Sequence, residues 1–206
     1  MMTATAFSQR DPRWRGELLG TGQATIGRAG CLLTASAAML ATWGVDTDPH
    51  RLNQWLIANQ GYAVGDLLTF SALKPFGVYF AAYIDCADIA APVARLIEEV
   101  RGGAGVLVCL DWEPGNALQP HWVYVTSLGE ANGQIVDPWQ LPGHEVVDLA
   151  TYLAPGWDAA RGIFYVALYH RSQAGALAQL RTLAKPRTGR RSRAITQPRL
   201  YERPGE

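Results

Sequence analysis

The sequence predicts an α+β fold in which a helical N-terminal part packs on an antiparallel sheet. Apolar residues recur at helical spacing from Leu32 to Ala41, and alanine dominates the interior of that segment. From residue 105 onward, short apolar runs alternate with Gly, Pro and Asn, which is the pattern of strands joined by turns. The pair Asn132-Gly133 between two such runs predicts a hairpin, so the strands that it joins should be antiparallel.

The individual elements follow from their start and stop signals. Residues 7–25 form a loop, and Gly27 and Gly30 form a flexible approach to a helix that begins at Cys31 and stops at Gly44. Further helices are expected from the Asp48 cap to residue 58 and over residues 66–73, 89–100, 148–153 and 172–184, and strands over residues 78–84, 105–112, 123–128, 135–136, 143–147 and 162–170.

Cys31 is the candidate nucleophile. It lies in the first turn of its helix, where unpaired backbone N–H groups and the positive end of the helix dipole favour a thiolate. A thiolate is the attacking group of cysteine hydrolases. A lone cysteine is also commonly a small buried hydrophobic residue, which is how we interpret Cys86 and Cys109. The functional interpretation of Cys31 therefore depends on a base elsewhere in the chain.

A candidate base and a carboxylate to orient it flank the predicted hairpin. A hairpin brings its two outer ends together, so His121 and Asp137 should lie near one another, to within a residue or two of register. An imidazole oriented by a carboxylate is the arrangement that activates a cysteine nucleophile. His144 is the weaker alternative base. Asp111 and Glu113 are two further carboxylates, for which a solvated strand end is the simpler interpretation.

Four short motifs resemble the bacteriocin-processing (double-glycine leader) peptidase family, a branch of the papain-like cysteine peptidases. The motifs are Gly30-Cys31 opening an Ala-rich helix, His121-Trp122-Val123 before a strand, Val136-Asp137-Pro138-Trp139 closing the next strand, and the opening Phe7-Ser8-Gln9-Arg10-Asp11-Pro12-Arg13-Trp14. The opening motif resembles the start of the stand-alone branch of this family. Each motif alone is weak, but four in the same order over residues 7–169 are specific, and they imply a papain-like fold.

The resemblance also implies a role for each site residue. Cys31 is the nucleophile, His121 is its partner and the acid for the leaving amine, and Asp137 fixes the imidazole tautomer. Papain-like enzymes place a Gln side chain beside the nucleophile, where it stabilises the oxyanion together with the cysteine backbone N–H. In the stand-alone branch the opening Ser-Gln fills this position, which implies Gln9. Gln9 is further from Cys31 than in the transporter-linked members, so Gln23 is kept as the alternative.

The implied function is a cysteine peptidase or amidase that hydrolyses a peptide or isopeptide bond. The same acyl-thioester could be passed to an amine, which would make the protein an acyl transferase. Stand-alone relatives occur in bacterial and phage proteins, so peptidoglycan cross-bridge peptides are a plausible substrate, and a virion-associated peptidase is one route to the cell wall. The alternative is a structural or adaptor protein of a larger assembly that keeps the peptidase-like fold.

Composition excludes several other classes. With 49% hydrophobic and 17% charged residues, the 206-residue chain has globular composition. Its three cysteines are widely spaced, which argues against a disulfide scaffold and a thiolate metal site. We expect no cofactor and no metal, because the common nucleotide- and zinc-binding motifs are absent from the sequence. The chain lacks a secretory signal and a long apolar run, so we expect no membrane span and a cytoplasmic location as synthesised.

The zero net charge conceals a basic C-terminal tail. Residues 1–184 hold 11 basic and 16 acidic residues, whereas residues 185–206 hold 7 basic and 2 acidic residues. We therefore divide the chain into a peptidase domain (1–170), a C-terminal helix (171–184) and a basic tail (185–206). Composition alone favours a solvated, disordered tail, and docking on a protein partner of an assembly is the functional alternative. Nucleic acid is the less favoured partner, because no aromatic platform or reading motif accompanies the arginines.

Overall fold

The described residues of the computed structural model, 3–113, 118–130 and 132–172, form an α+β fold built on a six-stranded sheet with strand order β1-β6-β2-β3-β4-β5. All neighbouring strands are antiparallel. The strands are β1 (Val78–Asp85), β2 (Gly105–Asp111), β3 (Pro120–Leu128), β4 (Gly133–Val136), β5 (Val146–Asp148) and β6 (Ile163–Arg171). The helices are α1 (Ile26–Ala29), α2 (Cys31–Thr42), α3 (Pro49–Ala58), η1 (Phe70–Phe76), α4 (Val93–Arg101), η2 (Leu149–Tyr152) and α5 (Ala159–Gly162).

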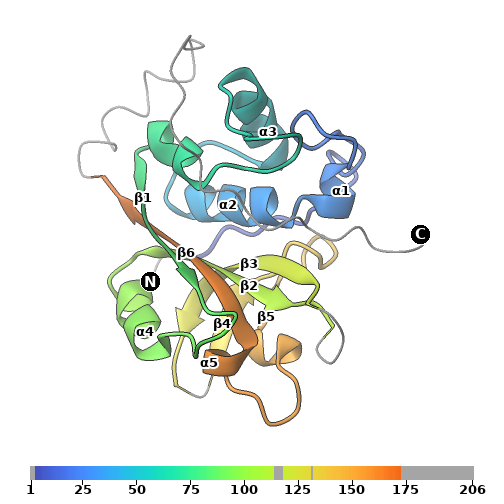
Figure 1. The fold of residues 1–206 in the computed structure, drawn as a ribbon. Coiled ribbons are helices and arrows are strands. Elements are labelled where there is room, and N and C mark those ends of the chain that lie inside the picture. Colours follow the sequence, from blue (N-terminus) through green and yellow to red (C-terminus); the bar gives the residue numbers. More distant parts are fainter. Residues whose placement is uncertain (1–2, 114–117, 131, 173–206) are drawn as a thin grey trace.

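The sheet separates two apolar clusters, and Figure 1 shows helices on either side of it. Helices α2 and α3 lie with η1 on one side, where α2 packs on β3 and β2. Helix α4 packs on the opposite face of β2 and β3. Because both faces of β2 are covered, every residue of this strand is buried, which explains its continuous apolar run. The expected α+β class, with the cysteine-bearing helical part packed on an antiparallel sheet, is confirmed.

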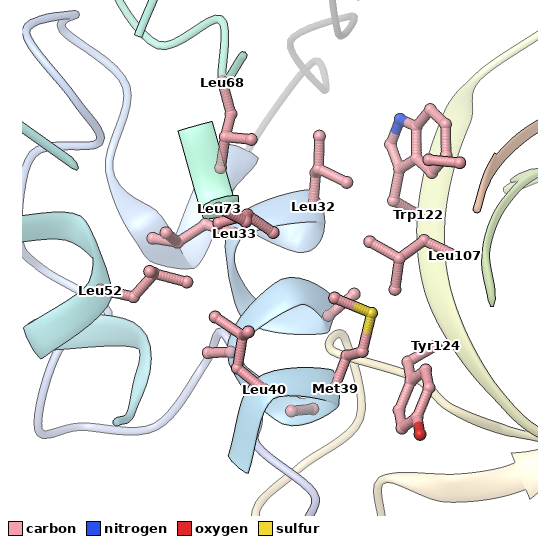
Figure 2. Packing of buried hydrophobic residues seen from close by; sticks show 14 of the residues in the cluster. Leu32, Leu33, Met39, Leu40, Leu52, Leu68, Leu73, Leu107, Trp122 and Tyr124 are labelled. Carbon is pink, nitrogen blue, oxygen red and sulfur yellow. The ribbon is translucent and has the colours of Figure 1, made fainter. Parts of the chain in front are cut away.

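Helix α2 is the central element of the helical layer. Figure 2 shows it between the sheet residues Leu107, Trp122 and Tyr124 on one side and Leu52 of α3 on the other. Its first ten residues are all buried, so it has no polar face. A helix that is apolar all round is one that is covered all round. The many alanines keep it narrow enough to fit between two layers.

Several element boundaries differ from the expectation. The expected helix over 66–73 is a 3₁₀ helix at Phe70–Phe76, which contains Pro75. Helix α4 begins four residues later than expected because Pro92 precedes it at the cap position. The short helix α1 before Gly30 was not expected. The expected strand over 143–147 was wrong in its first half, because Gly143 donates to Glu145 Oε2 (2.8 Å) in a turn and pairing starts only at Val146.

The C-terminal assignments fall almost entirely outside the described residues. Arg171, expected to start a helix over 171–184, is still part of strand β6. The rest of that helix beyond Ser172, and the basic tail over 185–206, cannot be compared with the structure. Within the part of the chain that is described, no helix combines the length and apolar character needed to cross a bilayer.

The junction of α1 and α2 has no room for a side chain at Gly30. A Cβ atom built there would lie 2.5 Å from the carbonyl oxygen of Ile26 and 2.8 Å from its Cγ2. The Gly30 N–H donates to that same carbonyl (2.8 Å), so the contact is with the main chain of the preceding turn. Gly30 therefore allows the close contact between α1 and α2 that places Cys31 at the start of a buried helix. Its role is this close contact and not the flexibility that the sequence suggested.

We expect Gly30→Ala to lower the free energy of unfolding by about 1–3 kcal/mol, because the backbone of α1 must shift to admit the methyl group. Gly16→Ala is the matched control, since a Cβ at Gly16 meets no atom within 4 Å. The measurement is urea unfolding of both variants and the wild type. Equal stability of the two variants would show that the α1–α2 joint is not constrained as described.

Candidate active site

Cys31 is the first residue of α2, and its side chain faces the sheet side of the helical layer. Gly30 caps the helix with its main chain and supplies no side-chain hydrogen bond. The N–H groups of the first helical turn have no acceptors within the helix, so they are available to a negatively charged group. Cys31 is only 5% exposed. The thiol therefore lies at the positively polarised end of a rigid helix.

His121 and Asp137 meet at the outer end of the β3–β4 hairpin. His121 is the second residue of β3, and Asp137 directly follows β4. The pairing of Tyr124 with Val136 sets the register of the two strands. His121 Nε2 lies 2.6 Å from Asp137 Oδ1, and both residues are buried. The proximity expected from the hairpin is observed, although His121 lies inside the strand rather than before it.

The environment of His121 favours its charged form. Burial acts to lower the pKa of the imidazole, but hydrogen bonds with Asp137 and Cys31 outweigh burial and raise the pKa to about 9. Because Nε2 is engaged by Asp137, Nδ1 is the ring nitrogen that remains for the interaction with Cys31. The ring thus lies between the thiol and the carboxylate and is an imidazolium at neutral pH.

Asp137 is held by donors from two elements. Within the described residues its carboxylate accepts four hydrogen bonds. Oδ1 accepts from His121 and from the Trp139 N–H (2.9 Å), whereas Oδ2 accepts from Gln140 Nε2 (2.7 Å) and the Tyr152 hydroxyl. Burial acts to raise the pKa of this carboxyl, but the hydrogen bond and charge of His121, with the hydrogen bonds from Tyr152 and the Trp139 N–H, lower it below its usual value.

Three aromatic rings surround the His121–Asp137 pair. Trp112 meets the His121 ring edge-on, with centroids 4.7 Å apart, and Tyr152 lies 5.5 Å from it. Trp139 in turn packs edge-on against Trp112 (5.1 Å), and the Arg10 guanidinium lies 4.8 Å above the Trp139 ring. These rings keep bulk water from the pair and so strengthen its electrostatic interaction.

Gln9 connects the two halves of the site. Its backbone N–H donates to Pro138 O (2.7 Å), beside Asp137, and its side-chain Nε2 donates to Gly27 O (2.9 Å), one turn before Cys31. The side chain is buried, and Oε1 has no hydrogen-bond partner among the described residues. The Nε2 group carries a second N–H beyond the one given to Gly27. Gln23, the alternative, is exposed on the loop before α1.

The remaining candidates lie apart from this arrangement. His144 is exposed in the turn before β5. Asp111 is buried rather than solvated, because its Oδ1 accepts from the Gln119 N–H (3.0 Å) and closes the loop between β2 and β3. Cys109 is fully buried, and its burial raises the pKa of the thiol well above the usual value, as expected for a packing residue. No group of metal-ligating side chains occurs in the described ranges.

Sequence reasoning did not single out Trp112, Gln140 or Tyr152. Trp112 directly follows β2, Gln140 lies in the turn after Asp137, and Tyr152 ends η2. The positions of Trp112 and Tyr152 are set by how β2 and η2 fold around the hairpin end, and no spacing in the sequence indicates these contacts, because they join elements that are far apart along the chain. Gln140 reaches Asp137 within one turn, three residues away in the sequence.

Comparison with known proteins finds similarity at the level of structure. No family model matches the sequence, and no curated protein matches it. A crystal structure from Bacillus anthracis, described as that of a candidate C39-like peptidase, covers 83% of this chain and 100% of its own, with 16% identity and a TM-score of 0.46. At this degree of similarity neither activity nor residue roles carry over to this chain.

The raised pKa of His121 predicts how stability depends on pH. A histidine whose pKa is about 9 when folded and about 6.5 when unfolded stabilises the fold fully below pH 6.5, and this contribution disappears as the pH rises through 9. The expected loss is about 3 kcal/mol between pH 6 and pH 10.

The measurement is urea unfolding from pH 6 to pH 10 for the wild type and for His121→Gln. The variant keeps a donor near Asp137 but has no titration of its own, so the difference between the two curves isolates His121. The same pH dependence in both proteins would contradict the assignment of the raised pKa.

Proposed function

We propose that this protein is a cysteine peptidase or amidase in which Cys31, His121 and Asp137 form the catalytic triad. The observation that carries the proposal is the continuous line of side chains from the N-terminus of α2 to the end of the β3–β4 hairpin. His121 interacts with Cys31 through one ring nitrogen and with Asp137 through the other. All three side chains are buried, so each is fixed in its orientation.

The first half of the reaction is acyl transfer to the thiol. The His121 imidazolium and the start of α2 favour the Cys31 thiolate, which attacks the carbonyl carbon of the scissile amide. The carbonyl oxygen becomes an oxyanion, for which the Cys31 backbone N–H and the second N–H of Gln9 Nε2 are the donors. His121 then gives its proton to the leaving amine, and the carbon–nitrogen bond breaks to leave a thioester on Cys31.

The second half releases the acid. His121, now neutral, accepts a proton from a water molecule that attacks the thioester carbonyl. The same two donors stabilise the second oxyanion, and its collapse expels the Cys31 thiolate. Asp137 remains ionised throughout, keeps the proton on Nε2 and so leaves Nδ1 free to exchange protons with the reacting groups. Peptide and isopeptide bonds, including short peptidoglycan cross-bridges, are the substrate class that we propose.

The first test of this proposal is the reactivity of Cys31 toward iodoacetamide. We expect His121→Ala to slow Cys31 alkylation at pH 6.5 by about tenfold or more, because the thiolate loses its cationic partner. Peptide mapping by mass spectrometry separates Cys31 from the two other cysteines. His50→Ala is the matched control, since His50 is exposed and pairs with Glu17 (2.7 Å) away from the site. Equal rates in all three proteins would refute an activated thiol.

The second test separates the role of Gln9 from that of Cys31 activation. Acylation by p-nitrophenyl acetate passes through an oxyanion, whereas alkylation by iodoacetamide does not. We expect Gln9→Ala to slow the acylation burst by about 10²-fold or more and to leave the alkylation rate unchanged. Gln23→Ala should change neither rate. If Gln23→Ala slows the burst and Gln9→Ala does not, the oxyanion donor is Gln23.

A further inference from the structure

Tyr152 reaches the candidate active site from an element that is separate from the hairpin. It is the last residue of η2, which begins where the Asp148 side chain accepts a hydrogen bond from the Ala150 N–H (2.9 Å). Its hydroxyl donates to Asp137 Oδ2, fifteen residues earlier in the chain. The side chain is buried, and its ring lies beside His121 and Trp112. The hydroxyl is therefore fixed by packing as well as by hydrogen bonding.

A buried carboxylate needs hydrogen-bond donors, and the Tyr152 hydroxyl is one of the donors to Asp137. An ionised carboxylate offers about four acceptor positions, and the four donors around Asp137 fill them. The two donors on Oδ2 stabilise negative charge on the oxygen that faces away from His121. Without these two donors the pKa of the buried carboxyl would be higher, because burial disfavours its charged form. A protonated Asp137 is neutral, so it cannot serve as a negatively charged acceptor for the N–H of His121 Nε2.

We propose that Tyr152 is a positioning residue that keeps Asp137 ionised and directs its Oδ1 at His121 Nε2. Gln140 shares Oδ2 with Tyr152, but it is half-exposed and belongs to the same turn as Asp137. Tyr152 is the donor that comes from another element, η2, which follows the edge strand β5. Its role in orienting the triad rests on the proposed function, whereas its effect on the charge of Asp137 does not.

The other groups around Asp137 do not replace this donor. His121 faces it from β3, and Cys31 of α2 lies on the far side of that ring. The Glu145 carboxylate is turned toward the Gly143 N–H, so only its main-chain oxygen contacts Asp137, at 2.7 Å from the Asp137 nitrogen. The side chains that donate to the carboxylate are therefore His121, Gln140 and Tyr152, and the Tyr152 bond is among the causes that lower the pKa of Asp137.

The test is the titration of Asp137 in Tyr152→Phe, which removes only the hydroxyl. With ¹³C-labelled aspartate, the carboxyl signal of Asp137 is assigned by comparison with Asp137→Asn. We expect its midpoint to move upward by about one pH unit in Tyr152→Phe. Tyr169→Phe is the matched control, because Tyr169 is buried and donates its hydroxyl to Phe70 O (3.1 Å). This control should leave the midpoint unchanged.

A second variant reverses the expected sign. Replacement of Tyr152 by 3-fluorotyrosine keeps the ring and makes the hydroxyl a stronger donor, so the Asp137 midpoint should move downward. This variant also keeps the proposal testable if Tyr152→Phe does not fold. An unchanged midpoint in either variant, or an equal shift in Tyr169→Phe, would overturn the proposal.

Iodoacetamide kinetics on the same proteins distinguish this proposal from the proposed function. If Tyr152 orients the triad, the acid end of the Cys31 reactivity profile moves upward in Tyr152→Phe together with the Asp137 midpoint. If the wild-type thiol is unreactive, the proposed peptidase function fails, and the Asp137 titration still decides the role of Tyr152. A shifted midpoint with an unchanged reactivity profile would overturn the positioning role.

Discussion

The buried hydrogen bond between His121 and Asp137 is the constraint on which the rest of this structure depends. Removing two ionisable groups from water is costly, and a buried pair does not by itself make a protein more stable. The pair persists because each remaining polar atom has a partner: Cys31 for the other ring nitrogen, and three further donors for the carboxylate. The loss of any one of these partners would leave a buried charge uncompensated.

The architecture around the pair follows from this requirement. The pair lies at the end of a hairpin, where the chain can turn back on itself and offer the Trp139 N–H and the Gln140 side chain to the same carboxylate. Helix α2 contributes its N-terminus, and η2 contributes Tyr152 from the opposite side. The central strand β2 ends in Asp111, and Trp112 follows it and closes the aromatic cover over His121. Helix α2, strand β3 and helix η2 therefore position Cys31, His121 and Tyr152, as a preorganised site needs.

The N-terminal segment holds the helical layer and the sheet together at this point. Ser8 Oγ donates to Gln140 O (2.5 Å), and Gln9 bonds to both Pro138 and Gly27. Trp14 fixes the same segment through its indole N–H, which donates to Ser8 O (2.8 Å). A short stretch thus connects the turn that carries Asp137 with the joint that leads to Cys31. Cys31 belongs to the helical layer and His121 and Asp137 belong to the sheet, so this segment joins the two layers at the candidate site.

The helix that starts at Cys31, the hairpin that brings His121 to Asp137 and the α+β class could all be predicted from the sequence, because short-range periodicity and turn chemistry encode these features. The sequence also singled out Gln9, by resemblance. That Tyr152 and Trp112 lie beside the hairpin end follows from the tertiary structure, and so does the burial of Asp111. The contacts of Tyr152 and Trp112 join elements distant in the chain, and no local pattern of residues records such contacts. The Gln140 bond to Asp137 and the late start of β5 at Val146 are local, but they depend on turn geometry that the residue types alone did not indicate.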